Sequence, residues 1–221
     1  MKFAVLSVMV IVLFLLNLFV GSVDIPARDV IDILLGDDTH GAAGFIVTGS
    51  RLPMAVTALL AGAGLAVSGL MLQTSFRNPL AGPSILGITS GASLGVALVL
   101  LFFGGSVAIG TLTIGGYAAV ILGAFVGSML MMGVLLGLST LLRNDLMLLI
   151  TGIMMGYLAS SLIMLLNYAS TAEGVQNYVM WGMSSFNGVS LQQLPLFAGV
   201  TLAGIFLSLL LICLLYTSDA A

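Results

Sequence analysis

The residues that are best suited to do chemistry lie where the chain interrupts its long apolar runs. The stretch FRNPLAGPSILG, residues 76–87, combines Arg77, Asn78, Pro79 and Leu80 with further proline and glycine residues. Asn78 offers both hydrogen-bond donors and an acceptor. Pro79 cannot donate a helical hydrogen bond, and the residue before a proline avoids the helical conformation. The pattern predicts a helix end at Asn78-Pro79 and a non-helical connection after it.

A second group of polar and small residues recurs at helical spacing further along the chain. Gly152, Gly156, Ser160, Ile163 and Asn167 fall within about 80° of one helical face, at 100° per residue. This face carries no charge. It could pack against another helix, or it could line a wide path for a bulky solute.

Catalytic and metal-binding patterns are missing from the sequence. No nucleophile–base pair stands out, and the phosphate-binding pattern G-x-x-x-x-G-K-[ST] does not occur. His40 has no Cys or His companions at ligand spacing, and the single Cys213 lies in an apolar run, where it is a small hydrophobe. We therefore expect no enzyme activity, no cofactor and no metal site.

The composition requires a membrane. Of the 221 residues, 60% are hydrophobic and 6% are charged, whereas a soluble domain carries roughly 25% charged residues. Such a chain cannot cover itself with a water-compatible surface, so lipid must be its solvent. The net charge of -3 gives no indication of nucleic-acid binding.

The elements that must position these residues are membrane helices. A bilayer core needs about 20 apolar residues per helix, and six stretches qualify: roughly 3–22, 52–73, 86–105, 111–138, 146–168 and 191–215. The first exceeds the apolar core usual for a signal peptide, which favours a retained helix. The segments lack the alternating polarity of barrel strands. The predicted fold class is an all-α, polytopic transmembrane bundle.

Four stripes of small residues, spaced four apart, lie in three of these segments. Such stripes let helix backbones approach closely in lipid. They comprise Gly87, Gly91 and Gly95; Gly115, Ala119, Gly123 and Gly127; Gly133 and Gly137; and Gly152, Gly156 and Ser160. We therefore predict a tightly packed bundle.

The distribution of basic residues sets the orientation weakly. With the amino terminus in the cytoplasm, Lys2, Arg77 and Arg143 lie inside, while Arg28 and Arg51 lie outside. Residues 24–50 would then face outside.

Three stretches resemble one family. RLPMAVTALLAGAGLAVSGLMLQTSFRNPLAGPSILGITSGASLG (51–95), LLITGIMMGYLASSLIMLL (148–166) and MWGMSSFNGVSLQQL (180–194) look like blocks of the FecCD-type permeases. These are membrane subunits of binding-protein-dependent ABC importers for ferric siderophores, haem and cobalamin. The resemblance runs from about Ser50 to Leu211.

The resemblance implies a larger assembly. Family members have about ten helices per subunit and work as two-fold dimers, homomeric or heteromeric, with two cytoplasmic ATPases. A periplasmic or lipid-anchored binding protein delivers the substrate. We treat residues 1–221 as one transmembrane permease domain that we expect to be incomplete at its carboxyl end, with the tail 214–221, which departs from the family pattern, as a candidate non-native segment. The expected location is the inner, cytoplasmic membrane.

The resemblance also assigns roles to residues. Asn78, Pro79 and Leu80 match the turn at the cytoplasmic mouth of the family's pathway, which makes them gate candidates; a plain turn is the alternative. Gly152, Gly156, Ser160 and Asn167 match the helix that borders the pathway.

Arg51 matches the first position of the family's Arg-x-Pro-Arg pattern, whose arginines pair with glutamates of the binding protein. Met54 replaces the second arginine. The alternative for Arg51 is a side chain that extends to the membrane surface.

The favoured function is therefore the permease subunit of an ABC importer for an iron–siderophore-type chelate. A secondary transporter or channel-like bundle without an ATPase is the alternative. The predicted helices contain no buried Asp, Glu, Lys or Arg, which proton- or sodium-coupled transporters usually need.

Overall fold

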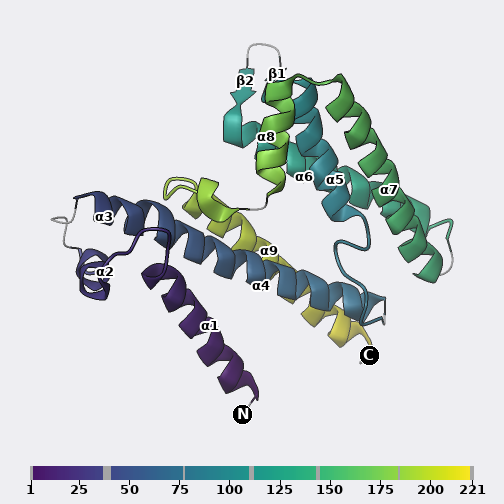
Figure 1. Cartoon of the computed structure of the whole chain (residues 1–221). Helices are drawn as coiled ribbons and strands as arrows, with labels where there is room; N and C mark the ends of the chain where they lie inside the picture. The colour runs from purple at the N-terminus through teal and green to yellow at the C-terminus, as the bar shows by residue number, and fades with distance from the viewer. Residues whose placement is uncertain are drawn as a thin grey trace. The chain divides into compact units, whose positions relative to one another are not determined.

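The computed structural model describes residues 2–36, 41–76, 78–109, 112–142, 145–183 and 185–219. The chain, whose helices and strands are labelled in Figure 1, divides into two compact units. The first unit consists of Met1–Val67 and Ser185–Ala221, and the second consists of Ser68–Ser184. Helix α4 begins in the first unit and ends in the second.

The elements of the first unit are helical. They are α1 (Lys2–Phe19), α2 (Ala27–Leu34), α3 (Gly41–Ile46), the π-helical turn η2 (Val47–Arg51), α4 (Leu52–Ser75), the 3-10 turn η4 (Phe186–Gly188) and α9 (Leu194–Asp219). The second unit contains α5 (Ile88–Ala97), the π-helical turn η3 (Leu98–Phe102), β1 (Ser106–Ile109), β2 (Leu112–Gly115), α6 (Gly116–Ser139), α7 (Asp145–Ala169) and α8 (Ala172–Gly182).

The predicted all-α, polytopic fold is confirmed. Within the described residues, five helices are long and apolar enough to cross a membrane: Lys2–Phe19, Gly41–Ser75, Gly116–Ser139, Leu146–Ala169 and Leu194–Leu211. The described residues also include one short antiparallel β-hairpin, in which β1 pairs with β2 from Ser106↔Gly115 to Ile109↔Leu112.

The third of the six predicted spans is wrong in its length. The helix there covers Ile88–Phe102, shorter than the spans above. At about 1.5 Å per residue it is roughly 22 Å long, against a bilayer core of about 30 Å. Turns occupy residues 83–87 before it, and Gly104 and Gly105 adopt positive φ after it. The fourth span also starts later than predicted, at Gly116 rather than 111, because the hairpin precedes it.

The segment predicted to face outside, residues 24–50, is largely helical where it is described. The amphipathic helix α2 buries Val30 and Ile33 against Val47, and Phe19 and Ile25 pack around this cluster. Pro26 directly precedes α2 and suits a helix start. The end of α1 and the turn η2 are thereby joined through α2.

The π-helical turn η2 has a cause in the sequence. Pro53 lies in a nearly continuous helical segment, where it cannot donate to the residue four positions before it, Gly49. A π turn shifts the bonding to five residues, as in the bond from Leu52 N to Val47 O. The extra residue places Arg51 in a widened turn rather than at a free helix start.

The second unit is built on glycine contacts between helices. A methyl group placed on Gly91 would lie 2.7 Å from the carbonyl oxygen of Gly127, and one placed on Gly95 would overlap the carbonyl of Gly123. Helices α5 and α6 therefore touch backbone to backbone, as the glycine stripes predicted. Gly133 and Gly137 differ, because a methyl group placed on either one would meet none of the described atoms within 4 Å apart from its own stretch of helix backbone.

Candidate functional site

The connection between α4 and α5 is non-helical, as predicted, at residue 76 and at residues 78–87. The side-chain oxygen of Asn78 accepts a hydrogen bond from Leu80 N at 2.9 Å, and its carbonyl accepts one from Ala81 N at 3.1 Å. These bonds form a tight turn around Pro79. Arg77, predicted to anchor this turn in the cytoplasm, lies outside the described residues.

The turn presents one apolar side chain outwards. Leu80 is 74% exposed, whereas Leu86 on the same connection is 3% exposed. Leu86 packs with Leu135 of α6 and Leu149 of α7 in a buried cluster. The connection is therefore seated on a core while Leu80 remains available to a neighbour. A gate role for Asn78, Pro79 and Leu80 stays a prediction.

The predicted pathway face on α7 divides into two parts. Gly152 and Gly156 are buried against the start of α5: a methyl group on Gly152 would lie 2.9 Å from the Cα of Leu86, and one on Gly156 would lie 3.2 Å from Ser90 Oγ. Gly87 completes this contact with φ of 71°, a left-handed conformation that glycine adopts without strain. Gly152 and Gly156 therefore take part in the packing of α7 against the start of α5.

The polar residues of the same face lie beyond this contact. Ser160 Oγ donates to the carbonyl of Gly156 at 3.0 Å, and Asn167 Nδ2 donates to that of Ile163 at 3.0 Å. Each side chain keeps an oxygen that can accept another bond. A pathway role for Gly152, Gly156, Ser160 and Asn167 stays a prediction.

Ser160 opens onto a small pocket that we call the hydroxyl pocket. It has a volume of about 290 Å³ and is lined by residues of α5, α7 and α8: Thr89, Ser90, Ser93, Ser160, Ile163 and Tyr178. Five of these six residues carry a hydroxyl, and none is charged. Within the described part of the chain, the hydroxyls of α5 and of Tyr178 make no hydrogen bond to protein.

Tyr178 is held in place by its neighbour Trp181. The two rings stack with centroids 6.0 Å apart. Burial raises the pKa of the Tyr178 phenol above its usual value of 10.0, because desolvation disfavours the charged form. The phenol therefore remains a neutral donor and acceptor at physiological pH.

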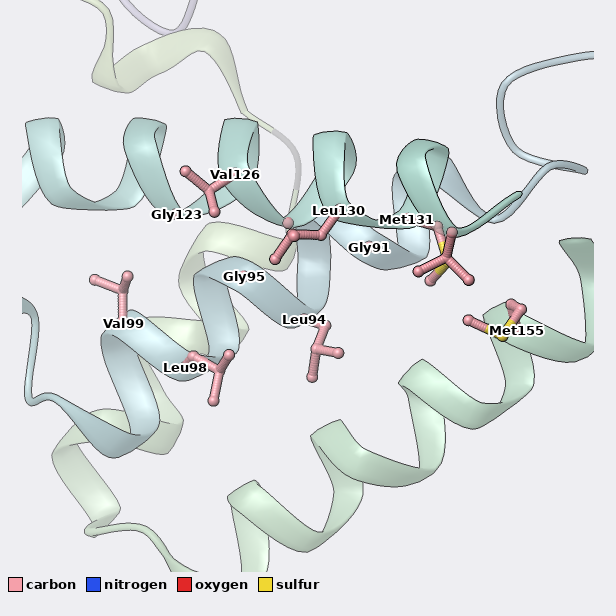
Figure 2. A pocket seen from close by; sticks show the side chains of 12 residues that line it. Gly91, Leu94, Gly95, Leu98, Val99, Gly123, Val126, Leu130, Met131 and Met155 are labelled. Atoms are coloured by element: carbon pink, nitrogen blue, oxygen red, sulfur yellow. The ribbon is translucent and has the colours of Figure 1, made fainter. Parts of the chain in front are cut away.

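A second pocket in the same unit is apolar. It has a volume of about 330 Å³ and lies where α5 crosses α6, with Met155 of α7 at its edge (Figure 2). Gly95 and Gly123 form part of its wall, and Leu94, Leu98 and similar side chains complete it. Nothing in this lining can hold a polar solute in a fixed orientation.

Arg51, the predicted docking residue, is buried in the first unit. Its side chain is 5% exposed. Nη1 donates to the carbonyls of Leu18 at 3.0 Å and Phe19 at 3.1 Å, and Nη2 donates to that of Val23. These acceptors lie at and just beyond the carboxyl end of α1, where helix carbonyls lack partners and cations are stabilised. Docking by Arg51 stays a prediction.

Sequence reasoning missed Thr89, Ser90, Ser93 and Gly21. The run TSGAS (89–93) gave a signal, because three hydroxyls recur within about one helical turn there. Gly21 gave none. A methyl group at Gly21 would lie 2.8 Å from the Arg51 guanidinium, so the glycine makes room for that side chain.

Within the described residues, no group of three or more His, Cys, Asp or Glu side chains is arranged to hold a metal ion. His40 lies outside those residues, and the side chain of Cys213 is not described.

Comparison with known proteins relates the chain to one transport family. The profile of the FecCD transport family matches residues 9–217. The molybdate import system permease protein MolB of Haemophilus influenzae is 42% identical over 137 residues, which are 62% of this chain and 38% of that protein. The vitamin B12 import system permease protein BtuC of Escherichia coli is 32% identical over 188 residues, 85% of this chain and 53% of that protein.

A solved structure described as an inward-facing conformation of a metal-chelate type ABC transporter has a similar fold. Its TM-score is 0.71 at 27% sequence identity, and the match covers 90% of this chain and 57% of that one. The chain thus spans about half the length of these relatives.

Proposed function

The chain belongs to the FecCD transport family, and we propose that it forms part of the permease subunit of an ABC importer for an iron–siderophore-type chelate. The observation that carries this proposal is the fold shared with a metal-chelate type ABC transporter over 90% of the chain. The relatives named above import vitamin B12 and molybdate. An uncharged pocket lined by hydroxyls suits a cargo whose surface carries oxygen atoms.

The proposed assembly has three kinds of component. Two permease subunits, identical or different, form the path across the cytoplasmic membrane. ATPase subunits on the cytoplasmic side supply the energy, and a periplasmic or lipid-anchored binding protein delivers the cargo. In this assembly Asn78, Pro79 and Leu80 form the cytoplasmic gate, and the 74% exposure of Leu80 supports contact with a partner subunit.

Reconstitution tests the proposal. The permease subunit that contains this chain is placed in proteoliposomes with its ATPase and binding protein. Uptake of an iron-loaded trihydroxamate chelate is measured beside that of vitamin B12 and molybdate. We expect chelate uptake that needs both ATP and the binding protein. Uptake of vitamin B12 or molybdate without uptake of the chelate would refute the proposed cargo. Uptake without ATP would refute the proposal that the protein is an ABC importer.

A further inference from the structure

The hydroxyl pocket owes its shape to close contacts on both sides of it. Gly87 and Gly152 bring the start of α5 against α7, because a methyl group on Gly87 would lie 2.7 Å from the carbonyl oxygen of Gly152. Ser90 follows Gly87 by three residues, so the helix turn that packs on α7 also presents a hydroxyl beside it. The α5–α7 wall of the pocket is therefore fixed by backbone contact.

Helix α8 forms the third wall by folding back toward α5. Ser170 Oγ donates to the carbonyl of Leu101 at 3.0 Å, which ties the junction of α7 and α8 to the end of η3. Gly174 is buried there, and a methyl group on it would lie 2.6 Å from Ser170 Oγ and 3.1 Å from the carbonyl oxygen of Leu100. Tyr178 lies four residues after Gly174, on the same face of α8. The hydrogen bond from Ser170 and the close packing of Gly174 therefore place the Tyr178 phenol at the pocket.

The lining specifies a type of ligand. A hydroxyl both donates and accepts a hydrogen bond, so this pocket can bind oxygen or nitrogen atoms of either polarity. It offers no charge to hold a free oxyanion. Its volume of about 290 Å³ is at the lower end of ligand sites, which are roughly 300–1,000 Å³. The pocket therefore fits one face of a larger, uncharged molecule.

Weak binding suits a place through which cargo passes. A transport path requires sites that are favourable enough to enter and weak enough to leave. Neutral hydrogen bonds contribute modestly, because each replaces a bond to water. A charged or metal-binding site would retain the cargo more strongly.

From this geometry we propose that the hydroxyl pocket is a transit site that binds the oxygen-bearing face of an uncharged metal chelate. Ser90, Ser93 and Tyr178 contribute the hydrogen bonds. The inference rests on the proposed function, whose cargo class it sharpens. It is nevertheless testable on the chain itself, without transport.

The protein carries its own reporter of this site. Trp181 is the one tryptophan in the sequence and stacks on Tyr178. The 221-residue chain is placed in lipid nanodiscs, and its tryptophan fluorescence is titrated with a ferric trihydroxamate chelate. We expect a saturable quench, which sodium molybdate at the same concentrations does not compete away.

The test variant combines Ser90→Ala, Ser93→Ala and Tyr178→Phe, which remove hydroxyls and keep shape. Each lost neutral hydrogen bond lowers affinity by about two- to tenfold, so the half-saturating concentration should rise by about tenfold or more. The control combines Ser161→Ala and Thr151→Val, whose hydroxyls bond to their own helix α7 and lie outside the pocket. It should stay within about twofold of the unaltered chain.

The possible outcomes separate the pocket from the transport function. An absent quench, competition by molybdate, or equal affinity of the test and control variants would overturn the proposal. If the triple variant does not fold, Tyr178→Phe alone should still weaken binding by about two- to tenfold, and unchanged affinity would overturn the proposal. A saturable, hydroxyl-dependent quench without ATP-driven uptake in proteoliposomes would support chelate binding in the hydroxyl pocket and refute the proposed transport function.

Discussion

Replacing Arg51 by methionine should destabilise the first unit. The change keeps an unbranched, flexible side chain but removes a guanidinium that donates to the carbonyls of Leu18, Phe19 and Val23. These acceptors would be left without a protein donor at a site where Arg51 is 5% exposed. The favourable interaction between the cation and the carboxyl end of α1 would also be lost.

The magnitude follows from the bonds that are broken. A hydrogen bond to a charged group contributes about 1.5–3 kcal/mol. Bonds from one guanidinium are not additive, so we expect a loss of about 3 kcal/mol in the free energy of unfolding. For a chain of this size that corresponds to a fall of roughly 6–12 °C in Tm.

The assay is thermal unfolding in detergent, with two further variants. Arg28→Met is the matched control, because it removes an exposed cation in the same unit and should change Tm little. Gly21→Ala keeps Arg51 but places a methyl group 2.8 Å from its Nε, and so should reproduce part of the loss. Equal Tm values for Arg51→Met and Arg28→Met would refute the reasoning.

The same Arg51→Met variant addresses docking. If Arg51 also contacts the binding protein, affinity for that protein should fall at low salt and less so at high salt, because salt screens the attraction between charges of the two proteins. Affinity that is unchanged at low salt, in protein shown to be folded, would leave Arg51 as a residue that positions α1.

Three further predictions concern packing, gating and topology. Gly95→Ala should lower the free energy of unfolding by about 1–3 kcal/mol, measured by thermal unfolding, because its methyl group overlaps the carbonyl of Gly123 on the facing helix. Gly133→Ala places its methyl group in open space and should not change the free energy of unfolding, so equal losses for the two variants would contradict the packing. The double variant Asn78→Ala with Leu80→Ala should make the full-length dimer leak a small fluorescent solute from proteoliposomes without ATP, and a tight, folded variant would leave these residues as a turn. Arg28→Cys, in a background without the native cysteine, should react with an impermeant maleimide from outside, and reaction only after permeabilisation would reverse the topology.

The sequence by itself determined the membrane environment, the helical class and the main breaks between helices. Apolar runs of bilayer length and glycines four residues apart are local signals, and each depends on residues within a few turns. Pro79 and Pro83 likewise predicted the non-helical connection, since a proline acts on its own neighbours. The family resemblance was also readable at this level, because its longest block, residues 51–95, is continuous.

Only the tertiary structure decided what the key side chains contact. Arg51 reads as an outward cation, yet its partners lie up to 33 residues earlier in the chain and are backbone carbonyls, which every residue possesses. The hydroxyl pocket joins α5 to α8 across about 90 residues of sequence through close approaches that glycine permits. Periodicity shows which residues share a face of one helix, but not which face of another helix meets it. The contact between α5 and α7 therefore became known only from the fold.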